Sequence, residues 1–516
     1  MTNYKLIHKL ILTIPHANKF MAMFKTYFGG LICLWFWYIA AIFVFLPFFP
    51  FGIWLYLIRI IEGSVYKCFF GAEELKADES IWIYDSPKNL SIINAVIEFD
   101  GYLSVSELQS AVVQRLVGAT DKDGNLMYSR VTKRIHAAPF NYYLVEEDKF
   151  NIEDHVYAWN KGKNYSTNEL TDILTMVSSR KFPSHLSPWE YVVIHIKGDV
   201  AVKTTAVVFR IHNCLADGIA LTDFLIRQLP DKSVSLPNLR RMTKRDKQYL
   251  TLKGMFFSPL VLLRMVFKKV QRTPVHSNKC LSGRKLYAWS KPLDLDLVKD
   301  IRRRLGVTVN DIIVGCVAKA FGAYFMERFP SQSARDVLCS IPVDTRINWK
   351  EARTFSNKAA FVQIVLPSSL VDSMEAVFES KRHMDSIKAT GDAFASRMHM
   401  KIFGYLLPAR WFNRLVLKFS NKAPVTVANI AGPQSPVSVA GQEIKFLSFF
   451  PPHRGNTTMG VSVFSYAGRY VIGVEADETV ISEPSKICSN FAAAVHELAK
   501  TTGVFMTKVH GDQRLT

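Results

Sequence analysis

The chain has few of the features that mark secreted, zinc-binding or acidic proteins. Its seven cysteines are scattered, odd in number and include no C-x-x-C pair. This pattern argues against a disulfide framework or a zinc site, and it fits a reducing, cytosol-facing compartment. Acidic residues are scarce, because 44 Asp and Glu stand against 64 Lys and Arg.

The resulting formal charge of +20 indicates an anionic partner or a well-solvated basic surface. The sequence contains no nucleic-acid-binding motif, so nucleic acid is a poor candidate. An anionic membrane explains the charge better, since 49% of the residues are hydrophobic. At 516 residues the chain exceeds one ordinary core, so two lobes of roughly 200 residues each are expected.

The longest apolar run occupies residues 31–58, after a basic segment, residues 1–30, that contains no acid. It can cross a hydrocarbon core of about 30 Å, and it is too long for a cleavable signal peptide. Pro47, Pro50 and Gly52 interrupt it past its middle. Residues 31–61 are therefore predicted to form either a hairpin in one leaflet or a single kinked span. Basic residues on both flanks, Arg59 among them, favour the hairpin.

The most informative stretch lies near residue 210. Residues 206–211 form a β-branched apolar run that predicts a buried strand. The sequence HNCLADG follows at 212–218, and apolar residues then recur at helical spacing. A strand that ends in a polar turn before a helix often presents reactive side chains beside a cleft.

HNCLADG resembles the HHxxxDG motif of the wax ester synthase/diacylglycerol acyltransferase family, which is related to chloramphenicol acetyltransferase. The resemblance implies a supporting role for His212 and places Asn213 at the position of the general base. Asp217 would hold the loop through a basic partner, and Gly218 would let the backbone pass close. An amide does not titrate, so Asn213 cannot act as a base. His212 is the obvious stand-in, although adjacent strand residues point to opposite faces.

Further segments resemble the family in its order along residues 80–500. They are Trp189-Glu190 (part of a Pro-Leu-Trp segment), residues 308–311 with Asn310, residues 341–346 (Pro-Val-x-x-Arg), and residues 428–433 with Asn429 and Gly432 (Ser-Asn-x-x-Gly-Pro). The family assigns Trp189, Asn310, Asn429 and Gly432 to the substrate tunnel. Trp189 could equally be a packed core aromatic, and Asn310 a helix cap.

The resemblance implies an α/β fold of two chloramphenicol acetyltransferase-like lobes with mixed sheets around a central tunnel. The lobes would occupy residues 78–238 and 284–505. Residues 239–283 would connect them, as a basic amphipathic segment suited to a helix in the membrane headgroup region. Local patterns predict strands at 90–99, 191–196, 359–366 and 459–466, and helices at 104–117, 295–305 and 484–499.

Two functions follow from different classes. The first is a membrane-bound O-acyltransferase that moves an acyl chain from acyl-CoA directly to diacylglycerol or a long-chain alcohol, with no metal or other cofactor. It would face the cytosol at the endoplasmic reticulum, a lipid droplet or the plasma membrane. The second is a catalytically impaired pseudoenzyme that binds acyl-CoA or lipid in the tunnel. Asn213 is the feature that separates them.

Overall fold

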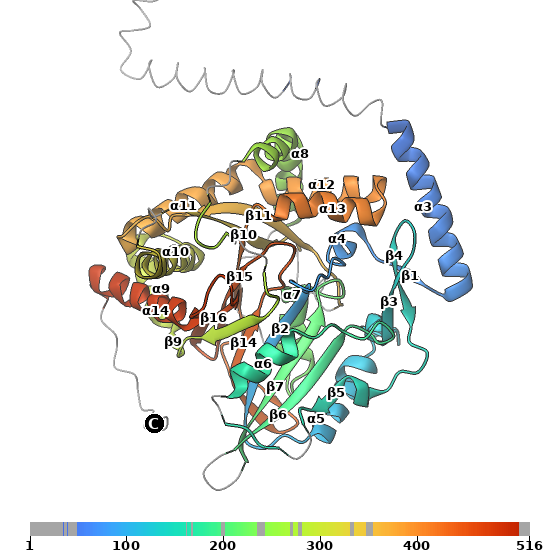
Figure 1. The fold of residues 1–516 in the computed structure, drawn as a ribbon, viewed down its shortest axis with the longest axis horizontal. Helices are drawn as coiled ribbons and strands as arrows, with labels where there is room; N and C mark the ends of the chain where they lie inside the picture. The colour runs from blue at the N-terminus through green and yellow to red at the C-terminus, as the bar shows by residue number, and fades with distance from the viewer. Residues whose placement is uncertain are drawn as a thin grey trace, which may run out of the picture.

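The computed structural model describes residues 35, 39 and 49–504, apart from short segments at 161–162, 167–168, 198–201, 235–242, 269–271, 277–280, 331–334 and 347–353. Two mixed sheets, each with its own core, form the two lobes (Figure 1). This confirms the predicted two-lobe α/β fold. The predicted basic segment 1–30 lies outside the described residues.

The first sheet has six strands in the order β13-β14-β2-β7-β6-β5. Their bounds are β13 (Ser438–Val439), β14 (Gln442–Phe450), β2 (Ile92–Asp100), β7 (Val202–His212), β6 (Trp189–Lys197) and β5 (Val156–Ala158). Strands β2 and β6 are buried almost throughout, because both faces of the sheet are covered. Strands β13 and β14 come from the second half of the chain, so the first lobe is completed by residues within the predicted C-terminal lobe.

The second sheet runs β11-β10-β12-β15-β16-β8, with β9 pairing to β16. Its strands are β11 (Ala359–Leu366), β10 (Val337–Asp344), β12 (Val425–Ala431), β15 (Met459–Tyr466), β16 (Arg469–Asp477), β8 (Lys285–Trp289) and β9 (Leu293–Asp294). Strands β10, β12 and β15 are parallel and the other pairs antiparallel. A small third sheet joins β1 (Glu73–Glu74), β4 (Tyr142–Glu146) and β3 (Lys133–Ala137).

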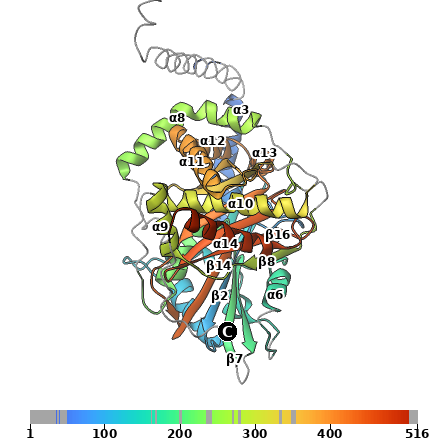
Figure 2. The ribbon, with the colours of Figure 1, turned by 90° about the vertical axis from the view of Figure 1, so that its left-hand side faces the viewer.

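Helices pack together over one face of the second sheet. Helices α9 (Leu295–Leu305), α10 (Val309–Arg328) and α14 (Pro484–Thr501) lie on one side, and α11 (Ser373–Thr390) packs against α10 and β11 (Figure 2). Thr308 caps α10, with Asp311 completing a capping box. In the first lobe, α5 (Val105–Val112) continues as a π-helical turn, and α6 (Glu169–Ser178) follows β5 in the chain.

A layer of helices lies over the seam between the lobes, at the top of Figures 1 and 2. It contains α8 (Lys244–Phe267), α12 (Asp392–Leu406) and α13 (Ala409–Ser420), with α4 (Ala77–Ser80) packed against it from the first lobe. Helix α8 and helix α10 are each long and apolar enough to cross a membrane by length and composition. Because α10 is mostly buried, it is a core helix, whereas α8 is mostly exposed.

Within the predicted membrane segment, residues 31–61, the structure describes residues 49–61 and two isolated residues, Trp35 and Ile39. The rest of the segment lies outside the described residues. Residues 49–61 begin α3 (Phe49–Phe70), which starts at the predicted break and runs on past it. Arg59 does not act as a flanking membrane charge, because its side chain is buried and forms a 2.8 Å ion pair with Glu74. The hairpin interpretation therefore loses one of its supports.

Candidate active site

A cavity of about 550 Å³ lies at the seam of the two lobes, under α8, α12 and α13. Strands β10, β11 and β12 and the HNCLADG loop also contribute to its wall. The lining is mainly apolar and includes Phe361, Met400, Phe412, Leu415 and Phe419. A cavity of this size and character suits a small molecule or a lipid chain.

Asp217 anchors the loop to the second lobe. Its Oδ1 accepts the Ala220 amide (3.0 Å) as the N-cap of α7 (Gly218–Asp223). Its Oδ2 lies 2.9 Å from the Arg346 guanidinium and accepts the Lys358 amide (2.8 Å). Burial opposes the charge on Arg346, but Asp217 and Asp344 outweigh it and raise the pKa of Arg346. Arg346 is therefore the basic partner that the resemblance implied without naming its position.

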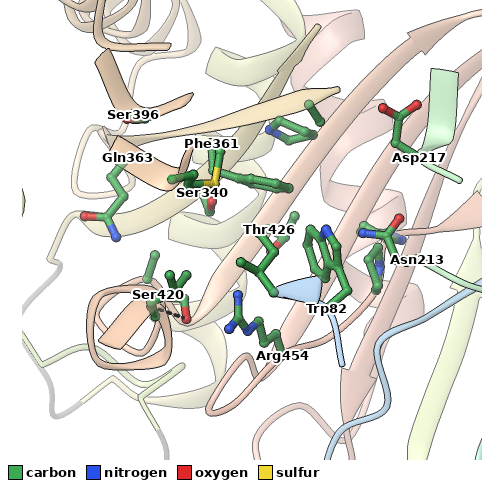
Figure 3. Close-up of a pocket in the computed structure, with 18 of the residues that line it drawn as sticks. Trp82, Asn213, Asp217, Ser340, Phe361, Gln363, Ser396, Ser420, Thr426 and Arg454 are labelled. Atoms are coloured by element: carbon green, nitrogen blue, oxygen red, sulfur yellow. Dashed lines mark hydrogen bonds between the residues drawn. The ribbon is translucent and has the colours of Figure 1, made fainter. Parts of the chain in front are cut away.

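Asn213 lies at the cavity wall at the start of the same loop (Figure 3). The side-chain amide of Asn357 donates a hydrogen bond to the backbone carbonyl of Asn213 (3.0 Å). In the orientation that satisfies both neighbours, its amide nitrogen donates to Ala216 O (3.0 Å) and its oxygen accepts from Trp82 Nε1 (3.3 Å). The position of the family's base is thus presented to the cavity, but the residue there is an amide whose nitrogen and oxygen each already have one partner in the loop or its surroundings.

His212 is buried and is not among the residues that line the cavity. Its Nδ1 accepts the Cys214 amide (3.2 Å), and its Nε2 lies 3.5 Å from Asp85. Burial disfavours the charged ring, whereas Cys214 and Asp85 favour it and raise the pKa of His212. A protonated ring has no lone pair to offer, and in the neutral ring the Cys214 amide occupies Nδ1. His212 therefore does not replace the missing base.

The remaining predicted residues fall into two groups. Gly218 and Asn429 line the cavity with Asn213 and Asp217. The Asn429 amide donates to the Asn310 side chain (3.3 Å), and Asn310 lies in the first turn of α10 beyond the cap at Thr308. Gly432 lies off the cavity lining, where a Cβ would come within 2.2 Å of the Ser465 carbonyl oxygen.

Trp189 is a packed core aromatic. Its side chain is 1% exposed, its Nε1 donates to the Val131 carbonyl (2.7 Å), and its ring stacks on His155. It is not among the cavity-lining residues. The structure therefore favours the packing interpretation of Trp189.

Most of the cavity lining was not predicted, and three of these residues carry polar groups of interest: Trp82, His399 and Arg454. His399, on α12, contacts Ser258 Oγ through Nε2 (2.6 Å), and burial lowers its pKa to about 4. No local pattern marks any of the three, because each becomes a cavity residue only through contacts far along the chain. Among the described residues, no group of three or more His, Cys, Asp or Glu could hold a metal ion.

Two mixed-sheet lobes, with an Asp-Gly loop of one anchored to the other beside an apolar cavity, define the class of two-lobe acyltransferases related to chloramphenicol acetyltransferase. Residues 77–273 match the wax ester synthase/diacylglycerol acyltransferase catalytic domain, and residues 355–499 match the WS/DGAT C-terminal domain. The chain belongs to this acyltransferase family, as the motif predicted.

Individual relatives agree. A protein of Mycobacterium tuberculosis named as a probable diacylglycerol O-acyltransferase is 23% identical, over 72% of this chain and 84% of its own length. Wax ester synthase/diacylglycerol acyltransferase 8 of Arabidopsis thaliana is 22% identical, over 67% and 82%.

Solved structures share the fold at lower identity. The wax ester synthase/diacylglycerol acyltransferase of Marinobacter aquaeolei VT8 has a TM-score of 0.58 at 13% identity, covering 84% of this chain and all of its own. A condensation domain of the calcium-dependent antibiotic synthetase has a TM-score of 0.54 at 12% identity, over 84% and 96%.

Proposed function

We propose that the protein is a membrane-bound O-acyltransferase that transfers an acyl chain from acyl-CoA to diacylglycerol or a long-chain alcohol, forming neutral lipid. The observation that carries the proposal is the loop anchored by Asp217 and Arg346, which presents residue 213 to an apolar cavity. The ion pair fixes this loop at the cavity wall, where an acceptor hydroxyl could be positioned.

In the proposed reaction the acceptor hydroxyl attacks the thioester carbonyl carbon. The new C–O bond forms as the C–S bond breaks, and the hydroxyl proton ends on the departing CoA thiol. Asn213 can orient the hydroxyl by a hydrogen bond but cannot take its proton. Loss of a general base costs about 10²–10⁴-fold in rate and leaves positioning intact, so a slow enzyme is expected.

His399 is the imidazole among the described cavity-lining residues, and it can serve as an alternative proton acceptor. Its lowered pKa keeps it neutral at physiological pH, and its Nδ1 is buried without a partner among the described residues. A neutral imidazole with a free ring nitrogen can accept a proton, but a pKa of about 4 makes His399 a weaker base than an ordinary histidine.

The membrane part of the proposal rests on the outer face of the helical layer. Leu252, Met255, Phe256 and Phe267 of α8 are exposed, and so are Phe51, Trp54, Leu57 and Ile61 of α3. Basic residues accompany them on α8, whose Leu262, Met265 and Val266 line the cavity. An apolar helix face flanked by Lys and Arg suits a membrane interface. A lipid acceptor could then reach the cavity from a cytosol-facing membrane, such as that of the endoplasmic reticulum or a lipid droplet, or the plasma membrane.

A second candidate function is a pseudoenzyme that binds acyl-CoA or lipid without transfer. The bonded amide of Asn213 favours it, because that side chain is built into the loop and has no titratable group.

The deciding experiment measures acyl transfer from labelled long-chain acyl-CoA to diacylglycerol and to a fatty alcohol. We expect slow transfer by the wild type, and Asn213→His to raise the rate by about 10²-fold or more. His399→Ala tests the alternative acceptor, and His195→Ala, outside the cavity, is the matched control. A wild type that is silent until Asn213→His activates it would select the binding protein. Silence of both would contradict an acyltransferase function.

A further inference from the structure

Arg454 is a buried cation inside the cavity. The residue is 6% exposed, and its side chain lines the cavity wall. One terminal nitrogen donates to the Asn413 carbonyl (3.2 Å), while Nε has no partner among the described residues. The guanidinium carbon lies 6.0 Å from the centre of the Trp82 ring. Figure 3 shows Arg454 and Asn213 on opposite sides of Trp82.

Among the residues that the structure describes, Arg454 differs from the other buried arginines in having no carboxylate partner. Each of those in the described part of the chain forms an ion pair: Arg59 with Glu74, Arg130 with Glu79, Arg210 with Glu190 and Arg346 with Asp217. The two acids that line the cavity, Asp217 and Asp344, are both bound to Arg346. No described carboxylate forms an ion pair with Arg454.

A buried charge without a counter-ion is costly. Burial lowers the pKa of Arg454 to about 9, yet the group stays charged at neutral pH. The Trp82 ring and the single carbonyl offset only part of the lost hydration. The missing negative charge can come from a molecule that fills the cavity.

The walls define the rest of that molecule. Beside the cation, the lining is mainly apolar, so the occupant carries a long hydrocarbon chain. One guanidinium balances one negative charge, and its planar fork matches a carboxylate bidentately. We propose that the cavity binds a free long-chain carboxylic acid, with its carboxylate on Arg454 and its chain along the apolar wall. This ligand binds without any transfer reaction, so the inference does not depend on the function proposed above.

The test is equilibrium binding to the full-length protein in detergent, with palmitate, hexadecanol and hexadecyl phosphate as the probes. Palmitate and hexadecanol share a chain length and differ in the charged head. We expect the wild type to bind palmitate more tightly than hexadecanol, and Arg454→Met to weaken palmitate about ten- to a hundredfold while leaving hexadecanol unchanged. Arg454→Lys keeps the charge and loses the fork, so an intermediate affinity is expected. Arg414→Met removes an exposed arginine of α13 and serves as the control.

Three results would overturn the proposal. Equal binding of palmitate and hexadecanol by the wild type would mean that the site does not recognise the carboxylate charge. If hexadecyl phosphate bound more tightly than palmitate, and this binding depended on Arg454, the site would be assigned to phosphate-bearing lipids. Loss of hexadecanol binding in both Arg454 variants would mean that Arg454 supports the fold and not a ligand. If Arg454→Met still binds hexadecanol, the variant is folded, and its loss of palmitate binding then reports on the charge.

Discussion

The buried ion pair between Asp217 and Arg346 joins the two lobes at the active-site loop, and its strength can be measured. The side chains are 5% and 2% exposed and lie 2.9 Å apart. Asp217→Asn keeps nearly the same shape and can still accept the Ala220 amide as a helix cap. The substitution removes the negative charge, and it replaces Oδ2, which accepts from Arg346 and the Lys358 amide, by an amide nitrogen that cannot accept.

Breaking a buried ion pair by removing one partner costs about 3–5 kcal/mol. Arg346 keeps a second carboxylate, Asp344 at 3.1 Å, so the loss should fall at the lower end, about 3 kcal/mol. Transfer activity should fall as well, because the loop that carries Asn213 loses its anchor. The measurement is the urea midpoint of the full-length protein at constant unfolding slope.

A double-mutant cycle separates the pair from its surroundings. Arg346→Met should be destabilising alone, but adding it to Asp217→Asn should cost less than the sum, with a coupling of about 2 kcal/mol or more. The control is the pair Arg284–Glu478, whose side chains are 57% and 32% exposed and whose coupling should stay below about 1 kcal/mol. Additivity of the Asp217 and Arg346 changes within about 0.5 kcal/mol would refute the role given to the pair.

Two further outcomes are expected. Burial raises the pKa of Glu475 from 4.5 to about 7, because the folded state disfavours the charged carboxylate. The protein is therefore most stable below the unfolded pKa, where Glu475 is protonated in both states, and it loses this stability as pH rises through 7. Glu475→Gln should therefore gain stability relative to the wild type, by up to about 3 kcal/mol above that pH, and a flat difference in urea midpoints from acid to alkaline pH would contradict this. On α8, the double substitution Leu252→Ser with Phe256→Ser should lower acyl transfer to diacylglycerol in vesicles but not to a short soluble alcohol. The control, Val371→Ser with Phe378→Ser, removes apolar side chains that are exposed elsewhere and should leave both transfer rates unchanged.

Local sequence patterns predicted much of the fold. The helix at 295–305 and the strand at 359–366 are found with the same bounds. In the strand, buried and half-buried positions alternate, which is the period that a sheet with two unlike faces imposes. The helix has an Asp cap and a terminal Gly306 at φ 63°, both readable in the sequence.

The candidate site was only partly predictable. Asn213, Asp217 and Gly218 share one contiguous loop, so a motif could find them together. Arg454 and Trp82 reach the cavity from segments more than 350 residues apart, and nothing beside either residue marks it. The pairing of β14 with β2 is also non-local, and no periodicity within either strand specifies its partner.

That pairing has a consequence for how the protein is made. Strand β2, near residue 95, pairs on one side with β7 and on the other with β14, near residue 446. During synthesis the first lobe therefore emerges with an open, apolar edge at β2, which closes only after most of the chain has left the ribosome. Until then the edge is a template for pairing with other chains. We infer that the folding of this protein depends on protecting one strand over the time taken to translate some 350 residues.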